Sequence, residues 1–89
     1  MTDTPIDAST EGVMRAITPG EAEFLRQLVK IDAEGHYATR KRLPLADREQ
    51  DRIRQRCRRI GLAIYRTGRW ELTPIGRAAI LALDKVRNP

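Results

Sequence analysis

The sequence has very few of the residues on which metal sites and enzyme active sites are usually built. It contains one cysteine, Cys57, and one histidine, His36, among 89 residues. A lone cysteine excludes a disulfide within the chain and is typical of a reducing, cytoplasmic setting. His36 has no second ligand at a useful spacing, and there is no glycine-rich phosphate loop and no carboxylate pair in an apolar setting. We therefore expect no enzyme activity, no metal ion and no cofactor.

Long apolar segments and aromatic residues are also scarce. No run approaches the ~20 apolar residues of a membrane-spanning helix. Residues 1–16 lack the basic start and apolar centre of a secretory signal, so we expect none there. The four aromatic residues disfavour RNA recognition by base stacking. With 40% apolar and 33% charged residues, one small, soluble, cytoplasmic domain is expected, nucleoid-associated if it binds DNA.

Positive charge is abundant, and it is concentrated in one part of the chain. The net charge is +5, yet residues 1–35 carry three basic and seven acidic side chains, a net of −4. Residues 36–60 carry nine basic and three acidic side chains, a net of +6, and residues 61–89 a net of +3. This concentration points to a polyanionic partner at one surface. A basic helix face that serves only solubility is the alternative.

The charge pattern also separates an arm from the domain. Residues 1–16 show no apolar periodicity and are predicted to form a flexible acidic arm, with residues 17–89 as the folded domain. Arms that enter the minor groove of DNA are basic, so this one has the wrong sign for that role. We interpret it as a passive tail or a weak electrostatic competitor for the basic surface.

Capping signals predict the first helix and the segment after it. Thr18 is expected to cap a helix, with Glu21 in the reciprocal capping position and Gly35 at its end. Residues 36–38 are a candidate short strand. Residues 40–43 would then form a short second helix of a single turn, which Pro44 ends.

The most informative feature is an arginine-rich helix over residues 48–60, capped by Asp47 and ended by Gly61. At about 100° per residue, Ile53, Cys57 and Ile60 share one face and are expected in the core. There Cys57 would be a small buried hydrophobe rather than a redox sensor. The opposite face carries side chains that can bond bidentately to guanine and adenine edges. The candidate base-contacting residues are Arg48, Arg52, Gln55 and Arg59.

Alternating residues at 62–66 and 70–73 predict a β-hairpin. Directly paired residues share a sheet face, so a two-residue loop would pair Ile64 with Glu71 and mix apolar with charged side chains. We therefore predict a three-residue loop, Thr67-Gly68-Arg69. It pairs Arg66 with Trp70, allows these two to stack, and leaves Tyr65 on the other face. The core-facing set would be Leu62, Ile64, Trp70 and Leu72.

The last helix is predicted from about Pro74 to Val86, with Thr73 as its cap. Ile80 and Leu81 fall outside its apolar stripe, so they are candidates for a homodimer contact, with scattered exposed aliphatic residues as the alternative. The stripe itself is expected to contain Ile75, Ala79, Ala82, Leu83 and Val86.

Two sequence segments resemble a known fold family, the winged helix-turn-helix DNA-binding domains. They are Arg59-Ile60-Gly61-Leu62 and Trp70-Glu71-Leu72-Thr73-Pro74-Ile75-Gly76-Arg77. A helix that ends in Gly-Leu, a short wing and a Leu-Thr-Pro-x-Gly-Arg return strand is similar to regulators of the multiple-antibiotic-resistance (MarR-like) superfamily. The resemblance spans residues 18–86. It implies a mostly helical α+β fold in the order helix, short strand, short helix, recognition helix, β-hairpin wing, helix.

The resemblance also implies a function. The arginine-rich helix would lie in the major groove, and the wing would reach phosphates or the neighbouring minor groove. We therefore expect sequence-specific binding of double-stranded DNA by a small transcriptional regulator, which would form a homodimer if Ile80 and Leu81 make the contact described above. The alternative is a winged-helix module that docks to proteins and does not bind DNA. The backbone and wing contacts would be Arg40, Lys41, Arg42, Arg54, Arg58, Arg66 and Arg69.

Overall fold

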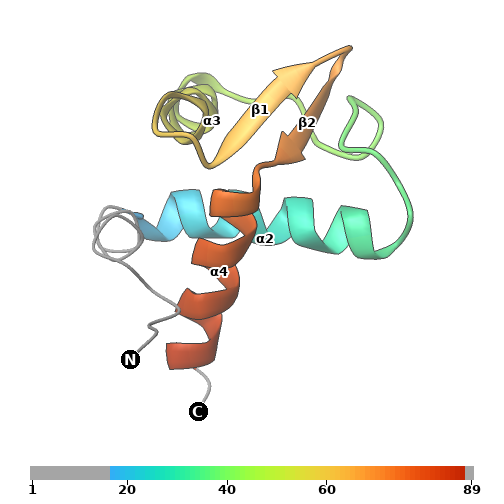
Figure 1. The fold of residues 1–89 in the computed structure, drawn as a ribbon. Helices are drawn as coiled ribbons and strands as arrows, with labels where there is room; N and C mark the ends of the chain where they lie inside the picture. Colours follow the sequence, from blue (N-terminus) through green and yellow to red (C-terminus); the bar gives the residue numbers. More distant parts are fainter. Residues whose placement is uncertain (1–16, 88–89) are drawn as a thin grey trace.

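Three helices and one antiparallel hairpin make up the part of the chain that the structure, a computed structural model, describes: residues 17–87 (Figure 1). This arrangement agrees with the predicted mostly helical α+β class. The predicted arm over residues 1–16 lies outside the described residues. Within residues 17–87, no helix combines the length and apolar character needed to cross a membrane. The elements are α2 (Pro19–Ala33), α3 (Arg48–Arg59), β1 (Ala63–Arg66), β2 (Arg69–Leu72) and α4 (Pro74–Arg87).

Helix α2 begins with the predicted capping box. Thr18 Oγ1 accepts a hydrogen bond from the Glu21 amide at 3.2 Å, and Glu21 Oε1 accepts one from the Thr18 amide at 3.1 Å. The helix ends at Ala33, and Gly35 follows with φ +78°, a left-handed conformation that suits glycine. Both predicted ends of this helix are confirmed.

The segment between α2 and α3 is less regular than expected. The candidate strand is reduced to one bridging residue, Ala38, whose carbonyl oxygen accepts a hydrogen bond from the Trp70 amide at 3.1 Å. The predicted short helix is a single hydrogen-bonded turn, in which the Thr39 carbonyl accepts from the Arg42 and Leu43 amides. Proline at position 44 cannot donate the next backbone hydrogen bond, so the turn does not grow into a helix.

Helix α3 follows the predicted pattern closely. The Asp47 carboxylate accepts from the Gln50 amide at 2.8 Å, and the Gln50 side chain accepts from the Asp47 amide at 3.3 Å. Cys57 is fully buried, and Ile53 and Ile60 pack against the core. The Leu62 amide donates back to the Cys57 carbonyl at 2.8 Å, which closes the end of the helix. The core face of this helix is therefore confirmed.

The hairpin loop prediction is wrong. The loop has two residues, Thr67 and Gly68, with φ +53° and +74°, which is the backbone of a type I′ turn. Such a turn matches the right-handed twist of the strands. The register is Ala63 with Leu72, Ile64 with Glu71, Tyr65 with Trp70, and Arg66 with Arg69.

This register corrects the predicted faces of the hairpin as well. Tyr65, rather than Arg66, packs against Trp70, with ring centroids 5.2 Å apart. Ile64 shares a face with Glu71, and it is Ala63 that is fully buried. The prediction placed the large residue Ile64 on the core face and Ala63 on the other, whereas the small Ala63 occupies a fully enclosed position.

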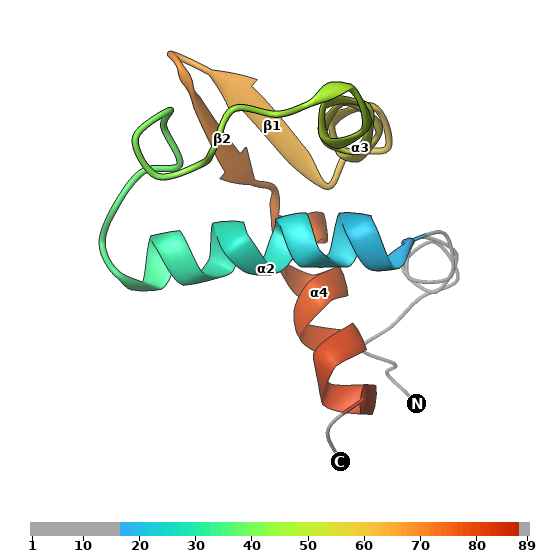
Figure 2. The same cartoon turned by 180° about the vertical axis from the view of Figure 1, so that it is seen from behind.

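The core lies where α2 crosses the other elements. Figures 1 and 2 show α3 and the hairpin on one side of α2, with α4 crossing it and extending away on the other. Trp70 meets Phe24 of α2 edge to face, with centroids 5.3 Å apart and planes at 90°. The largest fully buried apolar side chains are Leu25, Leu62 and Ile80.

Helix α4 is capped as predicted but turned relative to the predicted stripe. Thr73 Oγ1 accepts from the Gly76 amide at 2.9 Å and donates to the Gly61 carbonyl at 2.6 Å. Ile80 is buried, so its proposed dimer contact is wrong, whereas Leu81 is 52% exposed. Ile75, predicted in the core, is 54% exposed. The stripe that faces the core starts at Gly76, one residue later than predicted. At this position α4 lies against the Leu62 backbone, where only a residue without a side chain fits.

Replacement of Gly76 by alanine should destabilise the protein. The added Cβ would overlap the Leu62 carbonyl oxygen, which belongs to the backbone and cannot rotate away. Overpacking of this kind costs about 1–3 kcal/mol of unfolding free energy, sometimes more, although alanine is the better helix former. Urea unfolding followed by circular dichroism measures the loss. The control Gly20→Ala meets only the end of the Ile53 side chain and should change stability by less. Equal stability of the two variants would contradict this account.

Candidate nucleic-acid interface

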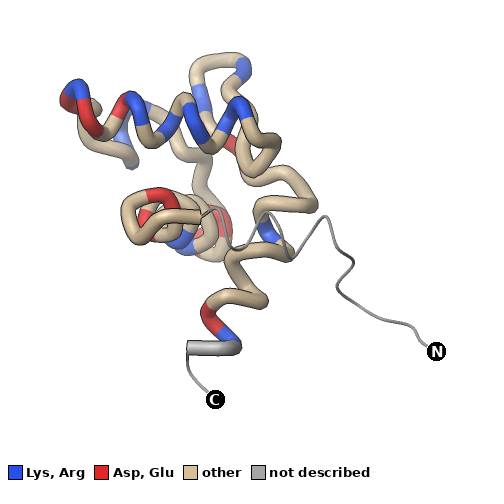
Figure 3. The backbone as a smooth tube through the Cα atoms, turned by 90° about the vertical axis from the view of Figure 1, so that its left-hand side faces the viewer, with Lys and Arg blue, Asp and Glu red and all other residues tan. Residues whose placement is uncertain are grey.

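The outward face of α3 carries three arginines that the fold does not use. Arg48, Arg52 and Arg59 are exposed, and within residues 17–87 none of them has an ion pair or hydrogen bond. Figure 3 shows Lys and Arg positions along the whole length of this helix. Because the opposite face is packed into the core, these guanidinium groups are directed away from the domain.

Gln55, the fourth predicted base-contacting residue, is placed differently. It is half-buried on the side of α3 that faces the hairpin, and its Oε1 accepts a hydrogen bond from Arg58 Nη1 at 3.3 Å. Arg58 is otherwise exposed. Gln55 and Arg58 thus form a hydrogen-bonded pair. This pairing distinguishes them from the three unpaired arginines.

Arg54 and Arg56 make contacts within the domain. Arg54 Nη2 donates to the Pro44 carbonyl at 3.1 Å, and its guanidinium lies 5.4 Å from the Phe24 ring centroid. Arg54 was predicted to contact the DNA backbone, and the structure instead uses it to hold the 38–46 segment against α3. The sequence did not single out Arg56, whose Nε lies 2.7 Å from Glu21 Oε2.

Glu21 is the buried partner of that ion pair. Its side chain is 2% exposed, whereas the Arg56 side chain is 44% exposed. One carboxylate oxygen completes the cap of α2 and the other binds Arg56 of α3. This single side chain therefore fixes the first turn of α2 against the middle of α3.

The two wing arginines share one carboxylate. Arg66 Nη2 lies 3.0 Å from Glu71 Oε1, and Arg69 Nε lies 2.8 Å from Glu71 Oε2. These hydrogen bonds from Arg66 and then Arg69 lower the pKa of Glu71, and the bond to Glu71 raises the pKa of Arg69. Arg69 also lies over the Tyr37 ring, 3.9 Å from its centroid. The wing cations are therefore partly neutralised where they were expected to meet phosphate.

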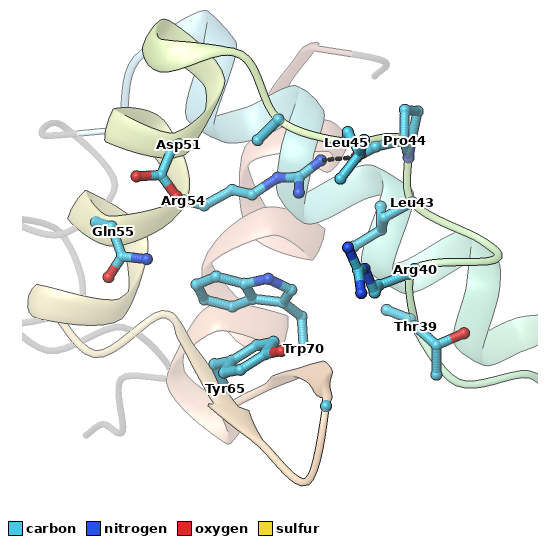
Figure 4. Close-up of a pocket in the computed structure, with 13 residues that line it drawn as sticks. Thr39, Arg40, Leu43, Pro44, Leu45, Asp51, Arg54, Gln55, Tyr65 and Trp70 are labelled. Carbon is cyan, nitrogen blue, oxygen red and sulfur yellow. Dashed lines mark hydrogen bonds between the residues drawn. The ribbon is translucent and has the colours of Figure 1, made fainter.

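The remaining predicted cations lie on the turn before α3. Arg40, Lys41 and Arg42 are all exposed, and Arg42 Nη2 lies 3.3 Å from His36 Nδ1. Arg40 faces α3 across a cavity of about 220 Å³ (Figure 4). The turn and α3 thus present cations on two sides of one hollow beside the hairpin.

Cys57 lies behind the exposed face and takes no part in it. The residue is fully buried, and burial followed by the charge of Glu21 raises the pKa of its thiol to about 12. The thiol is protonated at neutral pH and acts as a small apolar group, as expected from its position. Among residues 17–87, no three His, Cys, Asp or Glu side chains are grouped as a metal ion would require.

Comparisons with known proteins add no relative to this description. The chain matches no protein-family model, no curated protein and no solved structure. The candidate interface is therefore argued from its own geometry.

Loss of the Arg56 side chain should destabilise the domain. Arg56→Ala leaves the buried Glu21 carboxylate without its cationic partner, and breaking a buried pair in this way costs about 3–5 kcal/mol. We expect about 3 kcal/mol, the lower end, because Arg56 itself reaches solvent. Arg52→Ala removes the same charge from the exposed face and should change the unfolding free energy by less than about 0.5 kcal/mol. Urea unfolding of both variants tests this, and similar losses in the two would refute the assigned role of Arg56.

Proposed function

We propose that the protein binds double-stranded DNA through the outward face of α3 and acts as a small transcriptional regulator. The observation that supports this most is the set of three exposed, unpaired arginines on a helix whose other face is anchored in the core. Unpaired guanidinium groups on a rigid helix have no internal ion pair to break before they contact an anion. The winged helix-turn-helix resemblance agrees with this use of the helix.

The dimensions of α3 suit the major groove. A helix with its side chains is about 10–12 Å wide, and the groove is about 12 Å wide. Arg48 and Arg59 are eleven residues apart, which is about 16 Å along the helix axis. At roughly 3.4 Å per base pair, they could address positions about five base pairs apart. Arg52, between them, is the residue we assign to a guanine contact.

Phosphate contacts would come from cations around this helix. Arg40, Lys41 and Arg42 lie on the turn before it, and Arg58 lies near its end. Arg54 is omitted from this set because its guanidinium is used inside the domain. Arg66 and Arg69 of the wing can contact phosphate only when their ion pairs with Glu71 are broken.

A second copy of the chain would extend the contact to two half-sites. With Ile80 buried, the exposed large aliphatic residues within positions 74–85 of α4 are Ile75 and Leu81. They lie about 120° apart around the helix, so we propose Leu81, which remains exposed, as the contact through which a homodimer would form. A dimer of this kind would favour a palindromic operator.

The first experiment is fluorescence anisotropy of a labelled mixed-sequence duplex at ~50 and ~200 mM salt. Several phosphate contacts predict micromolar binding at low salt that weakens by at least about a hundredfold at the higher concentration. If the folded protein does not bind the duplex at low salt, the DNA function is refuted and a protein-docking role becomes the leading explanation.

Arg52→Ala should then be tested on a selected operator and on mixed-sequence DNA. If Arg52 bonds a guanine, the variant loses about 1–3 kcal/mol of binding free energy on the operator and little on other sequences. Equal weakening on both would instead make Arg52 a phosphate contact.

Glu71→Gln should strengthen duplex binding. The change releases Arg66 and Arg69 from their shared carboxylate and should increase the salt-dependence slope by roughly 1–2. The control Glu34→Gln removes the same charge from an exposed residue that pairs with no arginine among residues 17–87. Anisotropy titrations over a range of salt concentrations measure both slopes. The same slope for the two variants would show that the wing arginines do not reach phosphate.

A further inference from the structure

The cavity beside α3 has aromatic, apolar and charged walls. It encloses about 220 Å³ between α3, the segment 38–46 and the hairpin (Figure 4). Trp70 and Tyr65 line it from the hairpin. Leu43, Pro44 and Leu45 form an apolar wall, and the exposed fraction of Leu45 is 81%. Besides the two aromatic residues, the polar side chains that line it are Thr39, Arg40, Asp51, Arg54 and Gln55.

Trp70 presents an unused hydrogen-bond donor in this cavity. The residue is 8% exposed, and its indole nitrogen points toward the Arg54 side of the hollow (Figure 4). Among residues 17–87, no protein group accepts a hydrogen bond from this N–H. Because the indole N–H is accessible from the cavity, the acceptor atom of a ligand placed there can bind to it.

The other polar groups define what kind of ligand would fit. Arg54 donates one N–H to the Pro44 carbonyl and has further N–H groups that can donate. Arg40 has no partner among residues 17–87. These two side chains and Trp70 are donors only. The ionised carboxylate of Asp51, on the α3 side, accepts hydrogen bonds and cannot donate them. A matching ligand is planar and has acceptor atoms on one edge and N–H groups on another.

We propose that this cavity binds a purine base and that it prefers guanine. Sites that enclose drug-sized ligands have about 300–1,000 Å³, so about 220 Å³ suits one ring system without its sugar and phosphate. Guanine N1–H and N2–H₂ can both donate to the Asp51 carboxylate, while O6 and N7 accept from an arginine. Adenine places an acceptor, N1, where the carboxylate needs a donor. Tyr65, which is 48% exposed, supplies stacking surface.

This binding goes beyond the proposed duplex binding. In a duplex, the N1 and N2 edge of guanine is already paired with cytosine, so Asp51 could not bond to it. The base must come from a free purine or from an unpaired guanine in a single strand. Both sources share the same recognition chemistry, and they are separated by experiment.

The test follows the indole N–H resonance of the full-length protein by NMR. Trp70 is the single tryptophan of the chain, so this signal reports on the cavity alone. Titration with deoxyguanosine should shift it saturably, and deoxyadenosine should shift it less. A thymine oligonucleotide with one guanine, compared with thymine alone, tests the single-stranded source. A saturable shift with either guanine probe supports the proposal. A saturable shift with deoxyguanosine alone shows that a free purine is sufficient for binding.

Two variants make the result specific. Asp51→Asn should abolish the preference for guanine over adenine, because the acceptor of both guanine N–H groups is lost. Glu49→Gln removes the same charge from the same turn of α3 but lies outside the cavity, so it should keep the preference. No saturable shift with any guanine probe, or equal behaviour of the two variants, overturns the proposal. Duplex binding is measured separately, so either function can fail without the other.

Discussion

The ion pair between Glu21 and Arg56 is the constraint on which the exposed surface depends. A carboxylate that is 2% exposed would be costly to bury without a charged partner and hydrogen bonds. Glu21 has both, since it accepts from the Thr18 amide and binds Arg56. The pair therefore joins the start of α2 to the middle of α3. The direction in which α3 presents its outer arginines follows from this contact together with the burial of Cys57.

One helix thus uses the same residue type for opposite purposes. Arg54 and Arg56 lie on the flanks of the core face, where they find a carbonyl, an aromatic ring and a buried carboxylate. Arg48, Arg52 and Arg59 lie opposite the core face, and their side chains have no partner among residues 17–87. The internal pairs hold the helix, and the three outer arginines have no counter-charge among residues 17–87. Neither composition nor helical periodicity alone separates these two groups, because Arg56 lies only about 40° around the helix from Arg52.

Local signals predicted the parts of the fold that local physics determines. The capping boxes at Thr18 and Asp47 and the core face of α3 are confirmed because they depend on residues within one or two turns. The hairpin loop and the α4 stripe were wrong because packing between distant segments decides them, as the contact of Gly76 with the Leu62 backbone shows. The pairing of Glu21 with Arg56 joins residues 35 positions apart in the sequence, so no local pattern could reveal it. The cavity was equally beyond sequence reasoning.

The cavity follows from the shortness of the segment between α2 and α3. Where a full helix would fill the space beside α3, this chain has one turn, closed at Thr39 and stopped at Pro44. Leu43 alone is buried from that turn, and Arg54 reaches across to the Pro44 carbonyl to secure it. The Arg54 side chain takes the place of the packing that a second helix would provide, but it is too small to fill the cavity beside α3. The space that remains is bounded by Trp70, whose indole N–H therefore borders a hollow instead of a protein acceptor.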